Sequence, residues 1–261
     1  LPISLTKILT FHKLIPEFSF GSTNFSPRRF EKLLIFLQNK NYDFVSLEQA
    51  VTTPPEKSLL FTFDDGYLHL IKYLPQFIEK YKIKPLIFIP THYIGLNNEW
   101  DYSYLFQKSP HLDKNSIKQL SHLGVDFGSH GHTHKALTKL SDDALQSELI
   151  KSKNILEDIT GKEITTISYP FGRYNRKVID VVKKTGYKYG VTMNFPLTGD
   201  KHYTLGRYAI YGYDNMFTIN QKISRGKLYL LEKYKSMVTN KLAVGTILLN
   251  SIGARKKINS E

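Results

Sequence analysis

The sequence predicts an α/β fold in which parallel strands are joined by helical crossovers. Apolar segments of four to six residues alternate with longer segments that have helical spacing, and this alternation is typical of parallel sheets. The chain has 261 residues, 41% of them hydrophobic, so it can bury the core of one large domain or of two small ones. Histidine and aspartate residues follow several apolar segments. In a barrel built this way, functional residues lie where the strands end.

The first half of the chain contains four expected strands and two expected helices. The strands cover residues 8–11, 43–45, 59–63 and 86–89. One helix is expected to begin at Ser26 and Pro27, because serine is a preferred cap and proline suits the first turn. The other follows Tyr67 and keeps helical spacing as far as Tyr81, and Pro75 marks either its start or a kink.

The second half continues the alternation after a loop. Residues 90–110 hold several aromatic side chains without periodicity, which suits a substrate-binding wall or, equally, ordinary loop packing. The later expected strands cover residues 125–127, 164–169, 189–193 and 207–211. The later expected helices cover residues 117–123, 141–161, 175–186 and 214–225.

The composition limits the chemistry of any site. Lysine and arginine number 36 against 23 acidic residues, a formal net charge of +13, which favours an anionic glycan, a lipid headgroup surface or nucleic acid, or else forms a solvated basic face. No nucleic-acid-binding motif accompanies the charge, so no nucleic-acid partner is expected. Because the chain lacks cysteine, histidine and carboxylate side chains must hold any metal ion.

The two ends of the chain raise the question of the membrane. No basic region followed by an apolar core is visible after Leu1, which is consistent with removal of a signal or anchor segment. Residues 227–261 are expected to form a helical extension packed on the outside of the barrel. The alternative is a peripheral contact between this basic tail and an anionic membrane.

The strongest signal for a functional site lies in residues 59–67, where an apolar strand ends in Asp64 and Asp65. Two adjacent carboxylates repel one another and lose hydration when they are buried, so they require a cation or a shared proton. A metal ion would meet this requirement. The alternative is a surface turn in which both acids are solvated.

His130 and His134 are four residues apart, a separation that places two imidazoles on one side of a turn. With Asp65 they would form a site of two histidines and one carboxylate, which suits Zn²⁺ and also Co²⁺, Ni²⁺ or Mn²⁺. His132 lies between them and is expected to point away. The spacing alone is a weak signal, and purely structural histidines are the alternative.

Hydrolysis is the chemistry that such a site supports, because an open metal site acidifies water and polarises a carbonyl group. Asp64, beside the ligand Asp65, would then take a proton from water as general base. His12 ends a different strand and has an unperturbed pKa near ~6.5, so it is the candidate acid for the leaving group. A histidine without a catalytic role is the alternative.

Three segments occur in a recognisable order: residues 61–67 (FTFDDGY), 129–134 (SHGHTH) and 169–172 (YPFG). Together they resemble the polysaccharide deacetylase family, the carbohydrate esterases with a NodB-homology domain. The resemblance covers roughly residues 1–225 and implies a distorted (β/α) barrel of about seven parallel strands. It assigns Asp64 to the catalytic base, and Asp65, His130 and His134 to the metal ligands.

The third segment is expected to line the substrate groove. The resemblance assigns Tyr169, Pro170 and Phe171 to this region, and the Phe171 backbone N–H to an oxyanion donor. A preorganised donor of this kind contributes a few kcal/mol to transition-state stabilisation.

Two departures from the common family pattern concern the base and the acid. Many relatives begin the third motif with an arginine that holds the base, whereas this chain has Ser168; Arg207 could supply the charge, or could form a plain surface ion pair. The acid histidine usually follows a late strand, which here reads ILLN at residues 247–250. A permuted subgroup, the biofilm-polysaccharide deacetylases, places that strand first, and residues 9–12 (LTFH) fit it.

The resemblance implies a catalytic domain over residues 1–226 that removes N-acetyl groups from an N-acetylated sugar, with metal-activated water. The expected substrate is a cell-surface or exopolysaccharide glycan or a lipid-linked sugar, and the expected location is the cell envelope. Two alternatives stay open: a catalytically weak glycan-binding protein, suggested by Ser168, and a related amidohydrolase that acts on a non-sugar amide.

Overall fold

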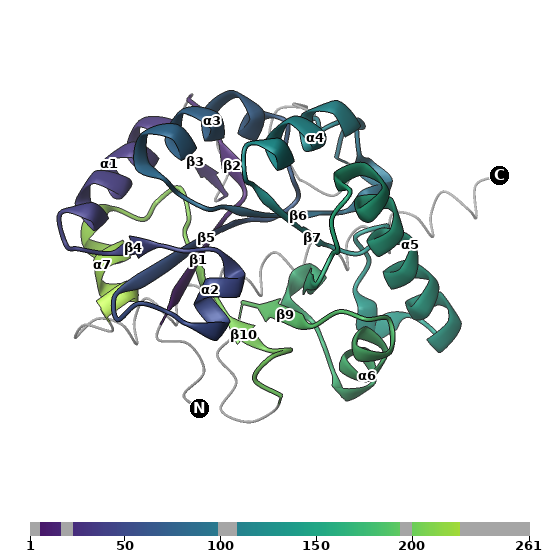
Figure 1. Cartoon of the computed structure of the whole chain (residues 1–261). Helices are drawn as coiled ribbons and strands as arrows, with labels where there is room; N and C mark the ends of the chain where they lie inside the picture. Colours follow the sequence, from purple (N-terminus) through teal and green to yellow (C-terminus); the bar gives the residue numbers. More distant parts are fainter. Residues whose placement is uncertain (1–5, 17–22, 99–108, 194–199, 225–261) are drawn as a thin grey trace, which may run out of the picture.

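The computed structural model describes residues 6–16, 23–98, 109–193 and 200–224. At its centre lies a sheet of parallel strands that is nearly closed into a barrel, with helices around it (Figure 1). The longer strands are β1 (Lys7–Phe11), β5 (Ser58–Phe63), β6 (Leu86–Ile89), β7 (Asp126–Ser129), β8 (Thr166–Ser168) and β9 (Tyr189–Thr192). Three two-residue strands complete it: β4 (Asp43–Phe44), β10 (Leu205–Gly206) and β11 (Tyr208–Ala209).

The expected distorted (β/α) barrel is confirmed. Its strands follow the order β10-β9-β8-β7-β6-β5-β1-β11, with β4 beside β5, and every pairing is parallel. Among the described residues the sheet has nine strands rather than about seven. The prediction was too low because a strand of two residues, such as β10, is too short to show an alternating hydrophobic pattern. A separate small sheet pairs β2 (Lys13–Leu14) with β3 (Asn24–Phe25).

One segment brings the two edges of the barrel together. β10 pairs with β9, β11 pairs with β1, and only Arg207 separates the two short strands. The Arg207 amide donates to the Thr192 carbonyl, and the Ile210 amide donates to the Thr10 carbonyl, so the chain changes partner within three residues. The strand predicted over residues 207–211 is confirmed as the two-residue β11, whereas β10, on the other side of the seam at Arg207, was not predicted.

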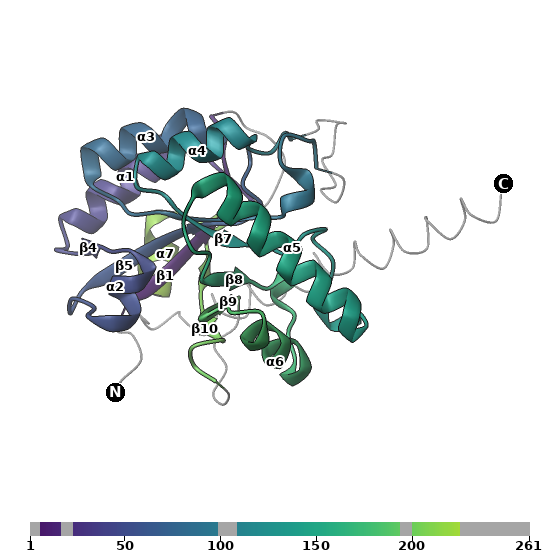
Figure 2. The ribbon, with the colours of Figure 1, turned by 45° about the vertical axis from the view of Figure 1, so that its right-hand side comes forward.

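The helices cover the outer surface of the sheet, and Figure 2 shows α5 and α6 outside β7–β9. They are α1 (Pro27–Gln38), α2 (Leu47–Thr52), α3 (His69–Tyr81), α4 (Lys114–His122), α5 (Asp142–Thr160), α6 (Arg176–Lys184) and α7 (Met216–Ser224). Three 3₁₀ turns accompany them: Thr91–Tyr93, Leu137–Lys139 and Pro170–Gly172. The expected caps form, since Ser26, Ser141 and Asn175 each accept a backbone N–H in the first turn.

Two helices differ from expectation for local reasons. α3 continues through Pro75 instead of starting there, because the residues on both sides bury one common apolar face. α2 has only six residues, too few to show a helical period, and a reciprocal capping box of Ser46 and Gln49 starts it.

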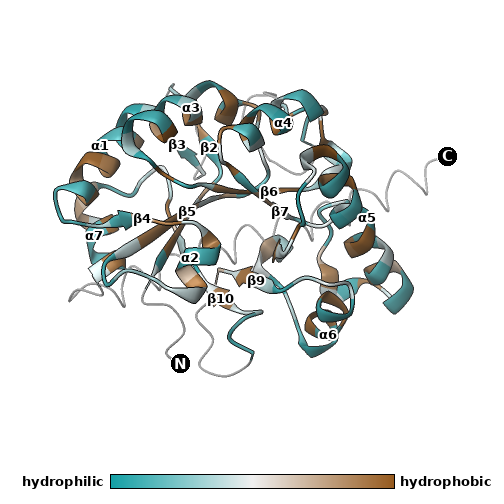
Figure 3. Cartoon of the chain, in the orientation of Figure 1, coloured by the Kyte–Doolittle hydropathy of each residue, from teal (hydrophilic) through white to brown (hydrophobic). Residues whose placement is uncertain are grey.

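The inside of the barrel changes from apolar to polar along its axis. Figure 3 shows the central strands as largely hydrophobic, whereas the helices carry both kinds of residue. At the amino ends of the strands, a small apolar cluster that includes Ile8, Leu60 and Phe88 fills the space, and Leu47 of α2 covers it. Two residues further along, Thr10 and Thr62 are fully buried. Asp64, Asp65, His130 and His134, which suit chemistry, lie beyond these threonines at the carboxyl end of the strands.

The ends of the chain add little to this picture. No helix in the described ranges is long and apolar enough to cross a membrane. The predicted extension over residues 227–261 lies outside the described residues, so its helical packing and its membrane contact stay predictions.

Gly190 in β9 provides a test of the packing outside the barrel. A Cβ there would lie 2.4 Å from the Tyr169 Oη and 2.6 Å from the Tyr203 carbonyl oxygen, which are themselves hydrogen-bonded to one another. We expect Gly190→Ala to lower the free energy of unfolding by about 3 kcal/mol. At Gly124, where a Cβ meets nothing within 4 Å, Gly124→Ala should cost only its left-handed backbone, about 1 kcal/mol. If urea denaturation showed the same loss of unfolding free energy for Gly190→Ala and Gly124→Ala, the close packing around Gly190 would be contradicted.

Candidate metal centre and its acidic neighbour

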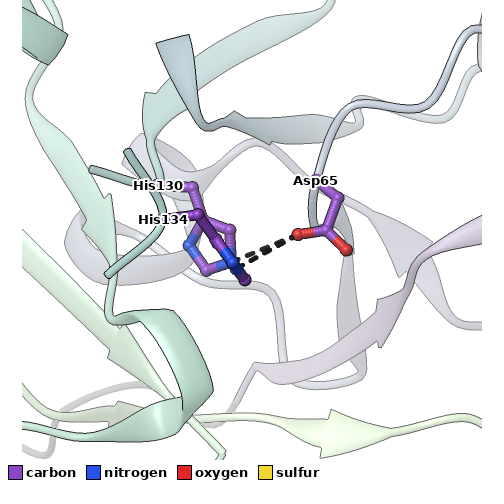
Figure 4. A group of neighbouring side chains, drawn as sticks. All are labelled: Asp65, His130 and His134. Carbon is purple, nitrogen blue, oxygen red and sulfur yellow. Dashed lines mark ion pairs between the residues drawn. The ribbon is translucent and has the colours of Figure 1, made fainter. Parts of the chain in front are cut away.

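Asp65, His130 and His134 meet at the carboxyl end of the barrel. All three are buried, and their ligand atoms lie within 4.8 Å of one another. The Asp65 Oδ1 is 3.4 Å from the His134 Nε2 and 3.6 Å from the His130 Nε2, and both imidazoles face the carboxylate (Figure 4). No other group of three or more such side chains occurs in the described part of the chain. The three residues predicted as ligands are thus brought together.

The backbone is strained where these side chains are presented. Asp65, His134 and Phe171 have φ values of 68°, 57° and 59°, in the left-handed region that costs a non-glycine residue about 1–2 kcal/mol. Strain of this kind persists where surrounding structure enforces it, and it gathers at functional sites. Gly66 continues the first turn at φ 60°, and a Cβ there would lie 2.2 Å from the Ile89 side chain, so only glycine fits.

The two imidazoles are prepared to act as neutral ligands. Burial lowers the pKa of His130, and burial together with the nearby His130 lowers the pKa of His134 well below its usual value. The His130 Nδ1–H donates to the Ser168 carbonyl at 2.8 Å, which leaves the Nε2 lone pair directed at Asp65. One carboxylate and two neutral imidazoles fit a divalent cation, although this set does not choose between Zn²⁺ and its neighbours.

Asp64 lies beside this group but has a different partner. The Arg207 guanidinium donates to both Asp64 oxygens at 2.7 Å, and also to the Ser168 hydroxyl at 2.8 Å. Burial opposes ionisation of Asp64, but the Arg207 charge and the hydrogen bonds from Arg207 outweigh it and hold the pKa of the carboxyl well below its usual range. Since only 1% of the Arg207 side chain is exposed, the alternative of a plain surface ion pair is wrong.

His12 comes from the next strand along the sheet. It follows β1 two residues after Thr10, whose hydroxyl accepts a hydrogen bond from Arg207 inside the barrel, so alternation turns His12 toward the same interior. Electrostatic interactions connect it with Asp64, His130 and His134, so it lies in the neighbourhood of all three. Its role as an acid stays a prediction.

The third motif contributes one ring and one turn to the site. The Phe171 ring lies 4.8 Å from the His134 ring, and Pro170 is buried at the start of the turn. The Tyr169 side chain does not match the expected groove wall. It is buried in the core outside the barrel, and its hydroxyl donates to the Tyr203 carbonyl at 2.9 Å. An aromatic residue at a strand end has the same sequence pattern whether it faces a groove or a helix.

Sequence reasoning missed the residue that holds the histidine loop. Glu148 of α5 is buried and accepts hydrogen bonds from the Thr133 amide and hydroxyl, between the two histidine ligands. The signal for it was a carboxylate placed on the buried face of a helix, next to Leu145 and Leu149.

Sequence comparisons connect the chain with known proteins. A sequence profile of the polysaccharide deacetylase family matches residues 52–190, more than half of the chain. YxkH of Bacillus subtilis, a protein named after the same family, is 30% identical over 191 residues, which are 71% of this chain and 63% of YxkH. A Staphylococcus aureus poly-β-1,6-N-acetyl-D-glucosamine N-deacetylase is 26% identical over 182 residues, 64% of this chain and 60% of that protein. The chain thus spans about three fifths of the length of these curated relatives.

Two solved structures share the fold. The Streptococcus pyogenes deacetylase PplD, in complex with acetate, superposes with a TM-score of 0.72 at 22% identity, covering 85% of this chain and 99% of that one. IcaB from Ammonifex degensii superposes with a TM-score of 0.70 at 18% identity, covering 85% and 96%. At these identities the likeness supports the barrel fold.

The Arg207–Asp64 pair can be tested by a double-mutant cycle. Arg207→Met should lower the free energy of unfolding by about 3–5 kcal/mol, because it leaves a buried carboxylate without its counter-charge. Adding Asp64→Asn should recover at least about 1 kcal/mol of this loss. The control cycle uses Lys188→Met and Glu163→Gln, an ion pair of the same 2.7 Å length with more than half of each side chain exposed. Its coupling should stay below about 1 kcal/mol. If the Arg207–Asp64 and Lys188–Glu163 cycles gave similar coupling energies in metal-free protein, the strong coupling expected of the buried pair would be contradicted.

The same cycle has an expected pH dependence. The pKa of Asp64 is lower in the folded protein than in the unfolded chain, so its stabilisation is complete above the unfolded value of ~4 and is lost as the pH falls toward the folded value. The coupling energy should therefore be larger at pH 6 than at pH 3. A coupling that rises on acidification would contradict the direction of the shift.

Proposed function

The chain belongs to the polysaccharide deacetylase family, and from this premise we propose that it is a metal-dependent hydrolase that removes N-acetyl groups from an N-acetylated sugar. One observation carries the proposal: a buried Asp65–His130–His134 group lies next to an Asp64 carboxylate that Arg207 keeps ionised. These are the components that hydrolysis of an amide requires, namely a place for a cation and a base beside it.

In the proposed mechanism, Asp65, His130 and His134 hold the divalent cation. Zn²⁺ is the favoured ion for two imidazoles and one carboxylate, with Co²⁺, Ni²⁺ and Mn²⁺ as alternatives. When bound, such a cation lowers the pKa of water towards ~7 and polarises a carbonyl oxygen. The Ser168 carbonyl fixes the ring of His130, and Glu148 fixes the loop between the two histidines.

We assign the removal of a proton from water to Asp64. Arg207 orients its carboxylate through both oxygens and also lowers its basicity, so Asp64 would be a poor base toward ordinary water. Proton transfer becomes less unfavourable as the pKa of the water falls, so the base depends on the cation site beside it. Arg207 is thus a positioning residue that acts through Asp64.

The remaining steps need a donor for the oxyanion and an acid. Water adds to the carbonyl carbon of the acetamide group, and the C–N bond then breaks to give acetate and a free amine. The Phe171 N–H is assigned to the oxyanion, which the left-handed turn beside His134 supports. His12 is assigned to deliver the proton that the leaving nitrogen takes up, since its charge already acts on Asp64.

The substrate class is an N-acetylated glycan or lipid-linked sugar of the cell envelope. The name of the Staphylococcus aureus relative supports a polymer of N-acetylglucosamine, and the net charge of +13 is compatible with an anionic glycan. The alternative of a catalytically weak binding protein rested on Ser168 and on the uncertain acid. The first ground loses support because Arg207 reaches the base from the other side, and the second depends on the role of His12. An amidohydrolase that acts on a non-sugar amide is distinguished by the products.

Acetate release tests the proposal directly. Metal-loaded protein should release acetate from poly-N-acetylglucosamine or from a lipid-linked N-acetyl sugar, and Asp64→Asn should lower kcat about 10²–10⁴-fold while bound metal persists. His130→Ala should lose the metal itself, as measured by elemental analysis. Asp143→Asn, an exposed acid on α5, is the matched control and should behave like the unmodified protein.

The outcomes separate the alternatives. Release only from a non-sugar amide would replace the N-deacetylase with an amidohydrolase. Glycan retention on a column without acetate release under several metals would instead favour the binding protein.

The acid role of His12 has its own test. His12→Gln should lower kcat for an N-acetylated sugar about 10²–10⁴-fold, because the amine leaves poorly without a proton. The loss should be much smaller for an aryl acetate, whose leaving group departs as an anion, whereas Asp64→Asn should impair both reactions. If His12→Gln slowed both substrates equally with metal content preserved, His12 would not be the acid.

A further inference from the structure

Two exposed aromatic side chains follow β11: Tyr213 lies on the segment between β11 and α7, and Phe217 lies in the first turn of α7. Tyr213 is 53% exposed and Phe217 is 55% exposed, and the other large hydrophobic side chains exposed on the described surface are aliphatic. The Tyr213 ring stacks on that of Tyr211 at a centroid distance of 5.2 Å and an interplanar angle of 16°, and Tyr211 is buried. One face of Tyr213 is thus supported from within, and the exposure of the residue comes from the rest of the ring.

This segment leaves the barrel at the edge that carries the candidate site. β11 is parallel to β1, with Ala209 opposite Thr10, and the Ile210 amide donates to the Thr10 carbonyl. The residues after Ile210 therefore emerge next to His12, which follows β1. Tyr213 follows two residues after Tyr211, so it lies at the same end of the barrel as His12, the proposed acid.

A buried ion pair fixes the turn that presents Tyr213. The Lys222 ammonium lies 2.6 Å from an Asp214 carboxylate oxygen and also donates to the Ala209 carbonyl, and both side chains are less than 5% exposed. The same Asp214 oxygen accepts the Tyr211 amide at 2.8 Å. From the other side, the Arg29 guanidinium of α1 donates to the carbonyls of Gly212 and Asp214.

A network of this kind is costly to desolvate, and the proposed chemistry uses none of its members. Its effect is to hold an exposed ring in one orientation. A ring that is already ordered loses little conformational entropy when a ligand binds, which is the condition for efficient recognition.

We propose that Tyr213 forms a sugar-binding subsite that stacks on a pyranose unit neighbouring the one whose acetamide group reacts. The inference rests on the proposed function and extends it to polymer recognition. A pyranose ring presents a face of C–H groups that is apolar and flat, and an aromatic ring with one supported face matches it in shape and polarity. The subsite would favour a chain of sugar units over a single one.

A substrate series of different chain lengths tests the subsite. Tyr213→Ala should raise KM for a poly-N-acetylglucosamine about three- to tenfold more than for the disaccharide, the size expected from one aromatic contact. Tyr213→Phe keeps the ring and should restore the polymer KM. The control is Leu123→Ala, a 43% exposed apolar side chain that caps α4 at the opposite end of the strands. Equal changes for disaccharide and polymer would overturn the proposal.

A binding measurement separates this inference from the proposed reaction. Asp64→Asn protein should be retarded in native gels that contain soluble poly-N-acetylglucosamine, and adding Tyr213→Ala should remove most of the retardation. If no substrate releases acetate but retardation still depends on Tyr213, the reaction fails and the subsite stands. If acetate is released and Tyr213→Ala matches the parent protein for every chain length, the subsite fails alone. Sedimentation could also show that the protein associates with itself through Tyr213 in the absence of glycan. This result would mean that Tyr213 binds a second copy of the chain, and it would overturn the sugar-binding subsite.

Discussion

The structure depends on the burial of one guanidinium group. Arg207 lies between β10 and β11, where the two edges of the barrel meet, with 1% of its side chain exposed. Moving such an ion out of water costs several kcal/mol, so it needs an opposite charge and hydrogen-bond acceptors beside it. Asp64 supplies the opposite charge, and the hydroxyls of Thr10, Thr62 and Ser168 supply further acceptors. Strands β1, β5 and β8 and the seam are therefore linked through one side chain.

The Arg207–Asp64 ion pair lies directly above the apolar layer of the barrel interior. The apolar cluster below it, with Phe88 under the guanidinium at 5.3 Å, keeps water away and so strengthens the charge interaction. Ser168 is part of the same arrangement, because its small side chain leaves room for a guanidinium that enters from the seam. An arginine at position 168 and an arginine at position 207 would compete for one space beside Asp64. The serine is thus compatible with a tuned base, provided that position 207 carries the charge.

Much of the barrel and of the candidate site could be predicted from the sequence, because both leave local signals. Buried strands that end in Asp64 and Asp65, or in a pair of spaced histidines, are visible in a few residues. The partner of Asp64 is not: Arg207 lies 143 positions away, and no local pattern joins the two. The seam was missed because two-residue strands have no period, and the burial of Tyr169 was missed because alternation does not tell which face of a strand end is covered.

The adjacent acids take different partners because the backbone turns between them. Asp64 continues the alternation of β5 and points at Arg207, whereas the left-handed φ of 68° at Asp65 turns the next carboxylate toward His130 and His134. With a guanidinium on one side and a cation held by the histidines on the other, each negative charge would have its own neutralising partner. Removing either partner would leave two carboxylates to share one positive charge, and the pKa of one of them would rise. The arginine at the seam and the histidine loop therefore form a single electrostatic unit, although they lie on opposite sides of the paired acids.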